Sequence, residues 1–200
     1  MRPREKLCTA ARDGSLEDVI KLLDSGGNIN WKGSKGLTPL QEASKADQLE
    51  VVSLLLNHNA EFEQKGTTSL HLACEGGHLK VAELLIEHGA VIDQPDQSQK
   101  GSTPIFNAVE NNHIEVVKLL LRNKAKFNIR NAKKQTPLMI ATKKGYKDIE
   151  DLLVKMHTLT QKDRAKPQKS ANNKSGGRKV MGSSGRIARE LAISVIAETI

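Results

Sequence analysis

The chain has 200 residues, of which 31 are Lys or Arg and 23 are Asp or Glu, so its formal net charge at pH 7 is +8. This length is enough for one well-buried domain and a tail, while an aromatic content of 2% is low for a β-sandwich or a β-barrel. No run of about 18 apolar residues is present and the N-terminus lacks the apolar core of a signal peptide, so we expect a soluble protein of the cytoplasm, with the nucleus as an alternative location.

A unit of two short helices recurs along the chain. In residues 66–90, Thr68 suits the N-cap of a first helix, Gly76-Gly77 suits a turn, and Gly89 suits the end of a second helix. Each helix is apolar on one face only, so neighbouring copies must cover these faces. Four copies align on a threonine, which begins the motifs Thr38-Pro39-Leu40, Thr68-Ser69-Leu70, Thr103-Pro104-Ile105 and Thr136-Pro137-Leu138.

The copies follow one another in five segments. Residues 4–36 lack the Thr-Pro start and carry charged side chains that suit an outer N-terminal cap, and residues 37–66, 67–101 and 102–134 follow as full copies. Residues 135–158 have a weaker second helix with many charges, which suits a C-terminal cap. The aligned threonines are 30, 35 and 33 residues apart, a period near 33.

This period, the Thr-Pro-Leu motif, the sequence Gly77-His78-Leu79 and the Gly89-Ala90 that follows a second helix together resemble ankyrin repeats over residues 4–158. The resemblance implies an all-α solenoid of helix pairs linked by β-hairpin loops, which we call fingers. A flexible C-terminal tail would follow the solenoid.

Two positions depart from the repeat pattern. Asp47-Gln48 stands where other repeats have Gly-His at the turn between the helices. Lys124 stands where Gly26, Asn59 and Gly89 end the second helix of other repeats. A left-handed backbone there costs a Lys about 1 kcal/mol, so we expect the substitution Lys124→Gly to raise the melting temperature.

The composition changes after residue 158. Residues 159–186 are polar, basic and rich in Gly and Ser, so we expect a basic disordered linker. Residues 187–200 are apolar and could form a short helix on the last repeat, a partner-binding segment or the start of another domain. Residues 159–200 hold nine Lys or Arg against three Asp or Glu, a net +6, and we expect the remaining +2 to be spread over the repeats.

No motif of a known enzyme or metal site is present. The sequence has no Cys-x-x-Cys, no His-Glu-x-x-His and no nucleophile elbow, so we expect no catalytic residues, metal or cofactor. The resemblance implies that His71, His78 and His113 instead tie adjacent repeats together by hydrogen bonds. Cys8 and Cys74 fall on the inner faces of first helices, where we expect buried thiols in a reducing compartment and no disulfide.

The resemblance also implies a protein-binding groove along the fingers and the inner faces of the first helices. Trp31 is the leading candidate contact, because exposed Trp is common at interface hot spots, although it could instead cover the base of its finger. Lysines at both ends of this surface indicate a partner with acidic segments. The complete candidate set is Trp31, Lys32, Lys35, Lys45, Lys65, Glu75, Lys100, Glu110, Lys133, Lys143 and Lys144.

We therefore expect a monomeric, non-enzymatic adaptor or scaffold that binds another protein. Two alternatives stay open: a regulatory or targeting region of a larger enzyme, and nuclear or nucleic-acid association through the basic tail, which lacks interleaved aromatic residues for base stacking.

Overall fold

The computed structural model describes residues 3–62, 66–96 and 101–164. The regular elements in these ranges are ten α-helices. They are α1 (Pro3–Asp13), α2 (Leu16–Asp24), α3 (Pro39–Lys45), α4 (Leu49–Asn57), α5 (Ser69–Gly76), α6 (Leu79–Glu87), α7 (Pro104–Glu110), α8 (Ile114–Arg122), α9 (Pro137–Lys144) and α10 (Lys147–Arg164).

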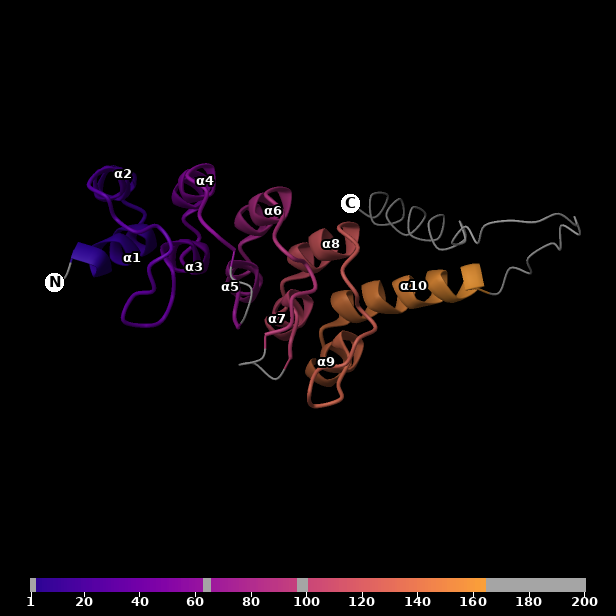
Figure 1. Cartoon of the computed structure of the whole chain (residues 1–200). Coiled ribbons are helices and arrows are strands. Elements are labelled where there is room, and N and C mark those ends of the chain that lie inside the picture. The colour runs from indigo at the N-terminus through magenta and orange to yellow at the C-terminus, as the bar shows by residue number, and fades with distance from the viewer. Residues whose placement is uncertain (1–2, 63–65, 97–100, 165–200) are drawn as a thin grey trace, which may run out of the picture.

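The helices stack in two rows (Figure 1). The odd-numbered helices form one row, in which each packs on the next, and the even-numbered helices α2, α4, α6, α8 and α10 form the second row. Each odd helix also packs on the even helix that follows it in the chain. This arrangement confirms the predicted all-α solenoid of helix pairs.

Threonine side chains begin three of the first helices. The hydroxyls of Thr38, Thr68 and Thr136 accept hydrogen bonds from the backbone N–H three residues later, which satisfies an amide of the first turn. Proline follows the threonine at the start of α3, α7 and α9, where its missing N–H costs nothing. The Thr-Pro-Leu motif is therefore a local signal for the start of a helix.

The left-handed residues of the backbone fall at three kinds of position in the repeats. Every described residue with a positive φ falls into one of these places, and Lys124, with φ of +67°, has the conformation predicted for it. The places are the turn between the helices (Gly14, Asp47, Gly77, Asn112, Gly145), the end of the second helix (Gly26, Asn59, Gly89, Lys124) and the finger (Gly36, Gly66, Gly101, Lys134).

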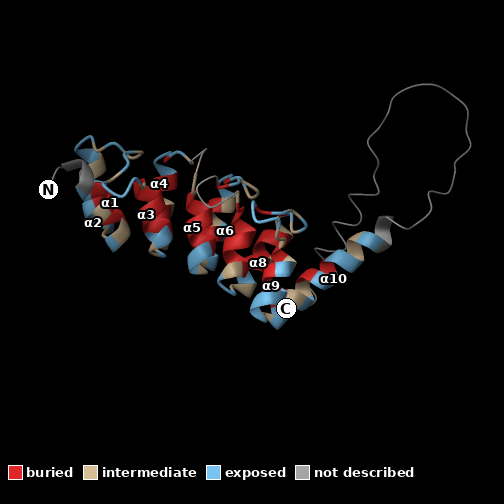
Figure 2. Cartoon of the chain, turned by 90° about the horizontal axis from the view of Figure 1, so that it is seen from below, coloured by how far each residue is buried: buried red, intermediate tan, exposed pale blue. Residues whose placement is uncertain are grey.

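The core runs through the whole stack as one aliphatic cluster. Buried residues run along the helices of the stack and include the first residues of α3, α5 and α7, whereas exposed residues gather in the loops and turns (Figure 2). Leu40, Leu55, Leu70 and Leu85 are at most 1% exposed. Each such leucine contributes about 1.5–3 kcal/mol of burial free energy, so stacking is the main source of stability.

The fingers contain less β-structure than expected. In the described residues no strand forms, and the finger before α7 has one isolated bridge, between Asp96 and Ser102. Two other fingers are closed by single backbone hydrogen bonds, from Gly33 to Leu37 and from Asn131 to Gln135. Each of these two fingers also has a turn bond, from Gly36 to Gly33 and from Lys134 to Asn131.

Helix α10 extends past the predicted end of the last repeat. We expected the linker to begin at residue 159, but the helix continues to Arg164, because residues 159–164 include no Gly or Pro and Leu159 stays half-buried. The rest of the predicted linker, to residue 186, and the apolar segment 187–200 lie outside the described residues. None of the described helices combines the length and the apolar composition needed to cross a membrane.

Candidate functional site

Side chains in or next to the turns between helices bind the C-terminal end of the first helix of the preceding repeat. We call this side of the molecule the turn edge. At each step a side-chain nitrogen lies within hydrogen-bond distance of the backbone carbonyl at or next to the C-terminal end of the previous first helix. The four pairs are Gln48 with Arg12 (3.1 Å), His78 with Lys45 (3.1 Å), His113 with Glu75 (3.0 Å) and Lys144 with Glu110 (2.6 Å).

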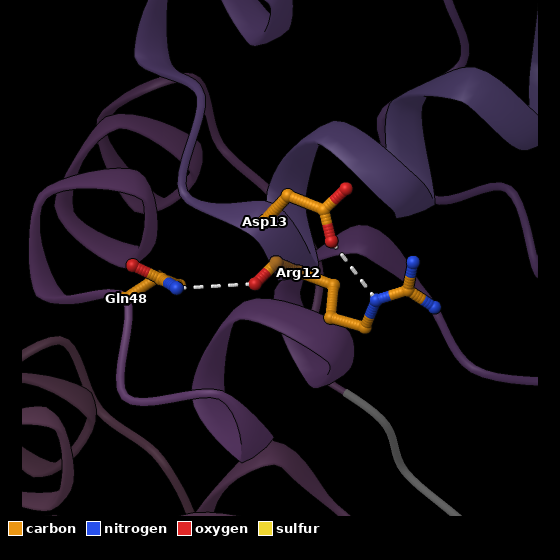
Figure 3. A network of polar contacts seen from close by, with 3 residues as sticks. All are labelled: Arg12, Asp13 and Gln48. Atoms are coloured by element: carbon orange, nitrogen blue, oxygen red, sulfur yellow. Dashed lines mark hydrogen bonds and ion pairs between the residues drawn. The ribbon is translucent and has the colours of Figure 1, made fainter.

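The roles predicted for His78 and His113 are therefore confirmed. Gln48 makes the equivalent bond at the position where the sequence departs from Gly-His. Its amide Nε2 donates to the backbone carbonyl of Arg12 (Figure 3). Arg12 also forms an exposed ion pair with Asp13, at 3.1 Å between Nε and Oδ1, and such a pair adds little stability.

A second set of cross-repeat bonds lies at the N-terminal ends of the first helices. Nδ1 of His71 accepts from the backbone N–H of Thr68, so Nε2 carries the proton and donates to the carbonyl of Ser102 at 3.0 Å. Burial lowers the pKa of His71, and its hydrogen bond to Ser102 and the charge of Asp96 oppose this only in part. The ring is therefore neutral at pH 7, and its bond to Ser102 is the predicted link between repeats.

Gln41 repeats this arrangement one repeat earlier. Its Oε1 accepts from the backbone N–H of Thr38, and its Nε2 donates to the carbonyl of Thr67 at 2.5 Å. The arrangement stops at the next repeat, where the fully buried Phe106 occupies the equivalent position. The buried hydroxyl of Thr103 has no hydrogen-bond partner among the described residues.

The two cysteines are free and buried, as the sequence predicts. Burial raises the pKa of the Cys74 thiol, so this group is an unreactive part of the core. The described residues contain no group of His, Cys, Asp and Glu that could hold a metal ion.

The structure divides the predicted contact residues between two edges of the molecule. Trp31, Lys32, Lys35 and Lys133 are exposed on the finger edge, the side where the fingers project beyond the odd-numbered helices. Lys45, Glu75, Lys143 and Lys144 are exposed and Glu110 is half-buried at the C-terminal ends of these helices, on the turn edge. The two edges are separated by the length of a first helix, which has seven or eight residues and is about 10–12 Å long. Lys65 and Lys100 lie outside the described residues.

Two of these residues, Trp31 and Lys144, also take part in contacts within the protein. The first finger, residues 25–38, contacts α1 through Cys8, whose Sγ lies 3.6 Å from the carbonyl oxygens of both Trp31 and Leu37 and can donate its one proton to either of them. Trp31 as a residue is 37% exposed. Lys144 donates to Glu110 and lies 5.8 Å from the ring centre of Tyr146, so its charge is partly engaged within the protein.

The charge of the repeats is not evenly spread, contrary to our expectation. Residues 37–66 and 67–101 each hold two Lys or Arg against five Asp or Glu, a net −3 for each repeat. Residues 102–134 hold seven against two, a net +5. Several of these cations lie in the fourth finger, residues 123–136, and most were not among the predicted contacts. Counting charge repeat by repeat would have revealed them.

Comparison with known proteins agrees with this architecture. A family model described as ankyrin repeats (3 copies) matches residues 7–96 and 92–163, whereas a search of curated proteins found no match. Ankyrin repeats are generally protein–protein interaction modules and are typically non-enzymatic. The family match, which extends over most of the chain, and the repeating helix pairs show that this protein belongs to the ankyrin repeat family.

Proposed function

We propose that this protein is a non-enzymatic adaptor or scaffold that binds a protein partner along its finger edge. The proposal rests on the observation that some side chains hold the repeats together whereas others stay exposed. The apolar faces of the helices are buried in the stack, and the turn edge holds neighbouring repeats together through the bonds described above. The finger edge presents large and charged side chains, among them Trp31 and Lys35, that this stacking does not bury.

The first finger is suited to binding because its backbone is held in place. The backbone N–H of Gly33 donates to Leu37 at 2.9 Å, and that of Gly36 donates to Gly33 at 2.8 Å. The amide oxygen of Asn30 accepts from the backbone N–H of Glu61, which links this finger to the next repeat. A loop that is already ordered loses less conformational entropy when a partner binds.

The test is a pull-down from the source cell with the full-length protein and two matched double variants. The first variant, Trp31→Ala with Lys35→Glu, changes the finger edge. The control, Ile20→Ala with Lys80→Glu, makes the same kinds of change at exposed positions of the even-numbered row. Circular dichroism must show that both variants are folded.

We expect the finger-edge variant to lose partners that the wild-type protein and the control retain. Equal recovery of partners by all three proteins would contradict the proposal.

We also propose that the protein resides in the cytoplasm or the nucleus. The support is that Cys8 and Cys74 are both buried free thiols, as is usual in reducing compartments. Microscopy of a fluorescent fusion tests this location, and retention in the secretory pathway would contradict it.

A further inference from the structure

A long basic segment spans the junction between the last two repeats. Between Glu115 and Asp148 the chain has ten Lys or Arg and no Asp or Glu, although the chain as a whole carries only +8. Some of these cations have structural explanations: Lys118 and Lys147 pair with Glu115 and Glu150, and the last turn of a helix favours cations such as Arg122.

Five of the cations have no such explanation. They lie in the fourth finger and are exposed, and none of them has a carboxylate partner within the described part of the chain. These residues are Lys124, Lys126, Arg130, Lys133 and Lys134.

Two of these lysines also occupy unfavourable backbone positions. Lys124, with φ of +67°, ends a second helix where two of the other three repeats have Gly. Lys134, with φ of +59°, stands in the finger where the three other fingers have Gly. Left-handed Lys is less stable than left-handed Gly, so local stability does not account for either lysine. Strained residues that persist are often functional.

The fourth finger also holds its cations in a defined arrangement. The buried side chain of Asn131 accepts hydrogen bonds from the backbone N–H groups of Lys133 and Gln135, at 3.0 and 3.1 Å. The backbone of Lys126 donates to Oδ1 of Asp93 at 2.9 Å, which fixes the start of the finger to the preceding repeat.

Side chains along the finger alternate between solvent and core. Lys126, Asn128 and Arg130 are exposed, whereas Phe127 and Ile129 pack against the core. The side chains of Lys126, Asn128 and Arg130 are therefore open to a partner on the solvent side of the finger.

We propose that the fourth finger binds an acidic segment of the protein partner, rich in Asp and Glu. This inference rests on the proposed function and adds the place and chemistry of one contact. A protein segment is favoured over nucleic acid for two reasons. The one aromatic residue of the finger, Phe127, packs against the core and offers no exposed ring for base stacking. The two preceding repeats, at −3 each, would repel a polyanion that continued along the solenoid.

The binding test measures fluorescence anisotropy with the full-length protein at low salt. One probe is a labelled, blocked 12-residue peptide with eight Glu, and the other is a labelled oligothymidylate with eight phosphates. The finger variant carries Lys126→Ser, Arg130→Ser and Lys133→Ser. The control carries Lys21→Ser, Lys80→Ser and Lys147→Ser, which remove the same charge from other exposed positions and leave the tail unchanged.

We expect the finger variant to bind the peptide about tenfold more weakly than the wild type, because three exposed charge pairs are lost, and the control to change far less. Added salt should weaken binding in the wild type. Equal losses in both variants would show that net charge alone attracts the peptide, and the inference would be overturned. Tighter binding of the oligothymidylate than of the peptide would assign the finger to nucleic acid instead.

Single variants add a readout that a purely structural role would not give. Lys124→Gly and Lys134→Gly should each raise the melting temperature by about 2–4 °C, because glycine relieves the left-handed strain, and should each weaken peptide binding. Higher stability with unchanged peptide affinity would contradict a binding role. The pull-down with Trp31→Ala and Lys35→Glu is independent of this finger, so the proposed function can hold where this inference fails.

Discussion

Gly77 shows how one residue serves both the backbone and the contact between repeats. Its φ is +76°, and a Cβ atom added there would lie 2.4 Å from Nδ1 of His113 in the next repeat. Gly14 is similar, because its added Cβ would lie 2.3 Å from Oε1 of Gln48. Gly26 is also left-handed, with φ of +84°, but faces open space. Glycine thus leaves room for a neighbouring side chain at Gly14 and Gly77, whereas at Gly26 it is favoured by the backbone conformation alone.

This difference predicts unequal effects of the same substitution. Gly26→Ala should lower the free energy of unfolding by about 1 kcal/mol, which is the cost of a left-handed Ala. Gly77→Ala should lower it further, by about 0.5–1.5 kcal/mol, because the displaced His113 would lose its bond to Glu75. Urea denaturation of both variants measures the two values. Equal losses would mean that His113 adjusts without losing its bond.

His71 makes the stability of the protein depend on pH. Burial lowers its pKa in the folded protein, whereas in the unfolded chain the pKa returns to about 6.5. Below about pH 6.5 the unfolded chain therefore binds more protons than the folded protein, and the stability falls as the pH falls. Above that pH both states are neutral at this residue and its contribution is constant.

Gln41 suggests the substitution that tests this dependence. It makes the same two kinds of bond in its repeat without an ionisable group, so His71→Gln should keep most of the stability at pH 7.5. The variant should lose less stability than the wild type between pH 7.5 and 5.5, measured by urea denaturation at each pH. The other five histidines are common to both proteins and cancel in the comparison. Parallel pH profiles would rule out His71 as the source.

At the scale of elements, the turn between α3 and α4 shows that different side chains can hold one repeat on the next. Asp47 adopts the left-handed conformation, with φ of +58°, that Gly77 has in the next repeat. Gln48 reaches the carbonyl of Arg12 as His78 reaches that of Lys45. The turn therefore keeps its geometry and its cross-repeat bond although its sequence differs.

Removing this bond should loosen the N-terminal repeat. Gln48→Ala should lower the free energy of unfolding by about 0.5–1.5 kcal/mol, because the amide no longer donates to Arg12. Gln48→His is the matched variant, since histidine makes this bond in the two following repeats, and it should retain most of the stability. Thermal and urea denaturation would show the ranking. Gln48→His as unstable as Gln48→Ala would mean that this turn does not accept the histidine geometry.

At the scale of the whole molecule, the repeats do not contribute equally to stability. The central helices have neighbours on both sides, whereas α9 packs on α7 on one side only within the odd row. Met139 is 53% exposed at the position where His71 and Phe106 are fully buried between repeats. The link that Gln41 and His71 make is also absent between α7 and α9.

Native-state hydrogen exchange should therefore show α9 opening at lower free energy than α5 and α6. In a solenoid each repeat is stabilised by its neighbours, and a terminal repeat with fewer cross-links opens first. Amides of α5 and α6 should report the global free energy of unfolding. Uniform protection across all helices would show that the stack unfolds as one cooperative unit.

The sequence by itself determined the helix pairs, their period and the left-handed backbone at Lys124, because caps, glycines and one-sided apolar patterns act within a few residues. It also located the first finger as a candidate contact, which remains a prediction. Tertiary structure alone decided what Gln48 binds, where the cross-repeat bonds stop at Phe106, and how the predicted contacts divide between two edges. The physical reason is distance along the chain: the bond from Gln48 to Arg12 joins residues 36 apart, so no local pattern encodes it.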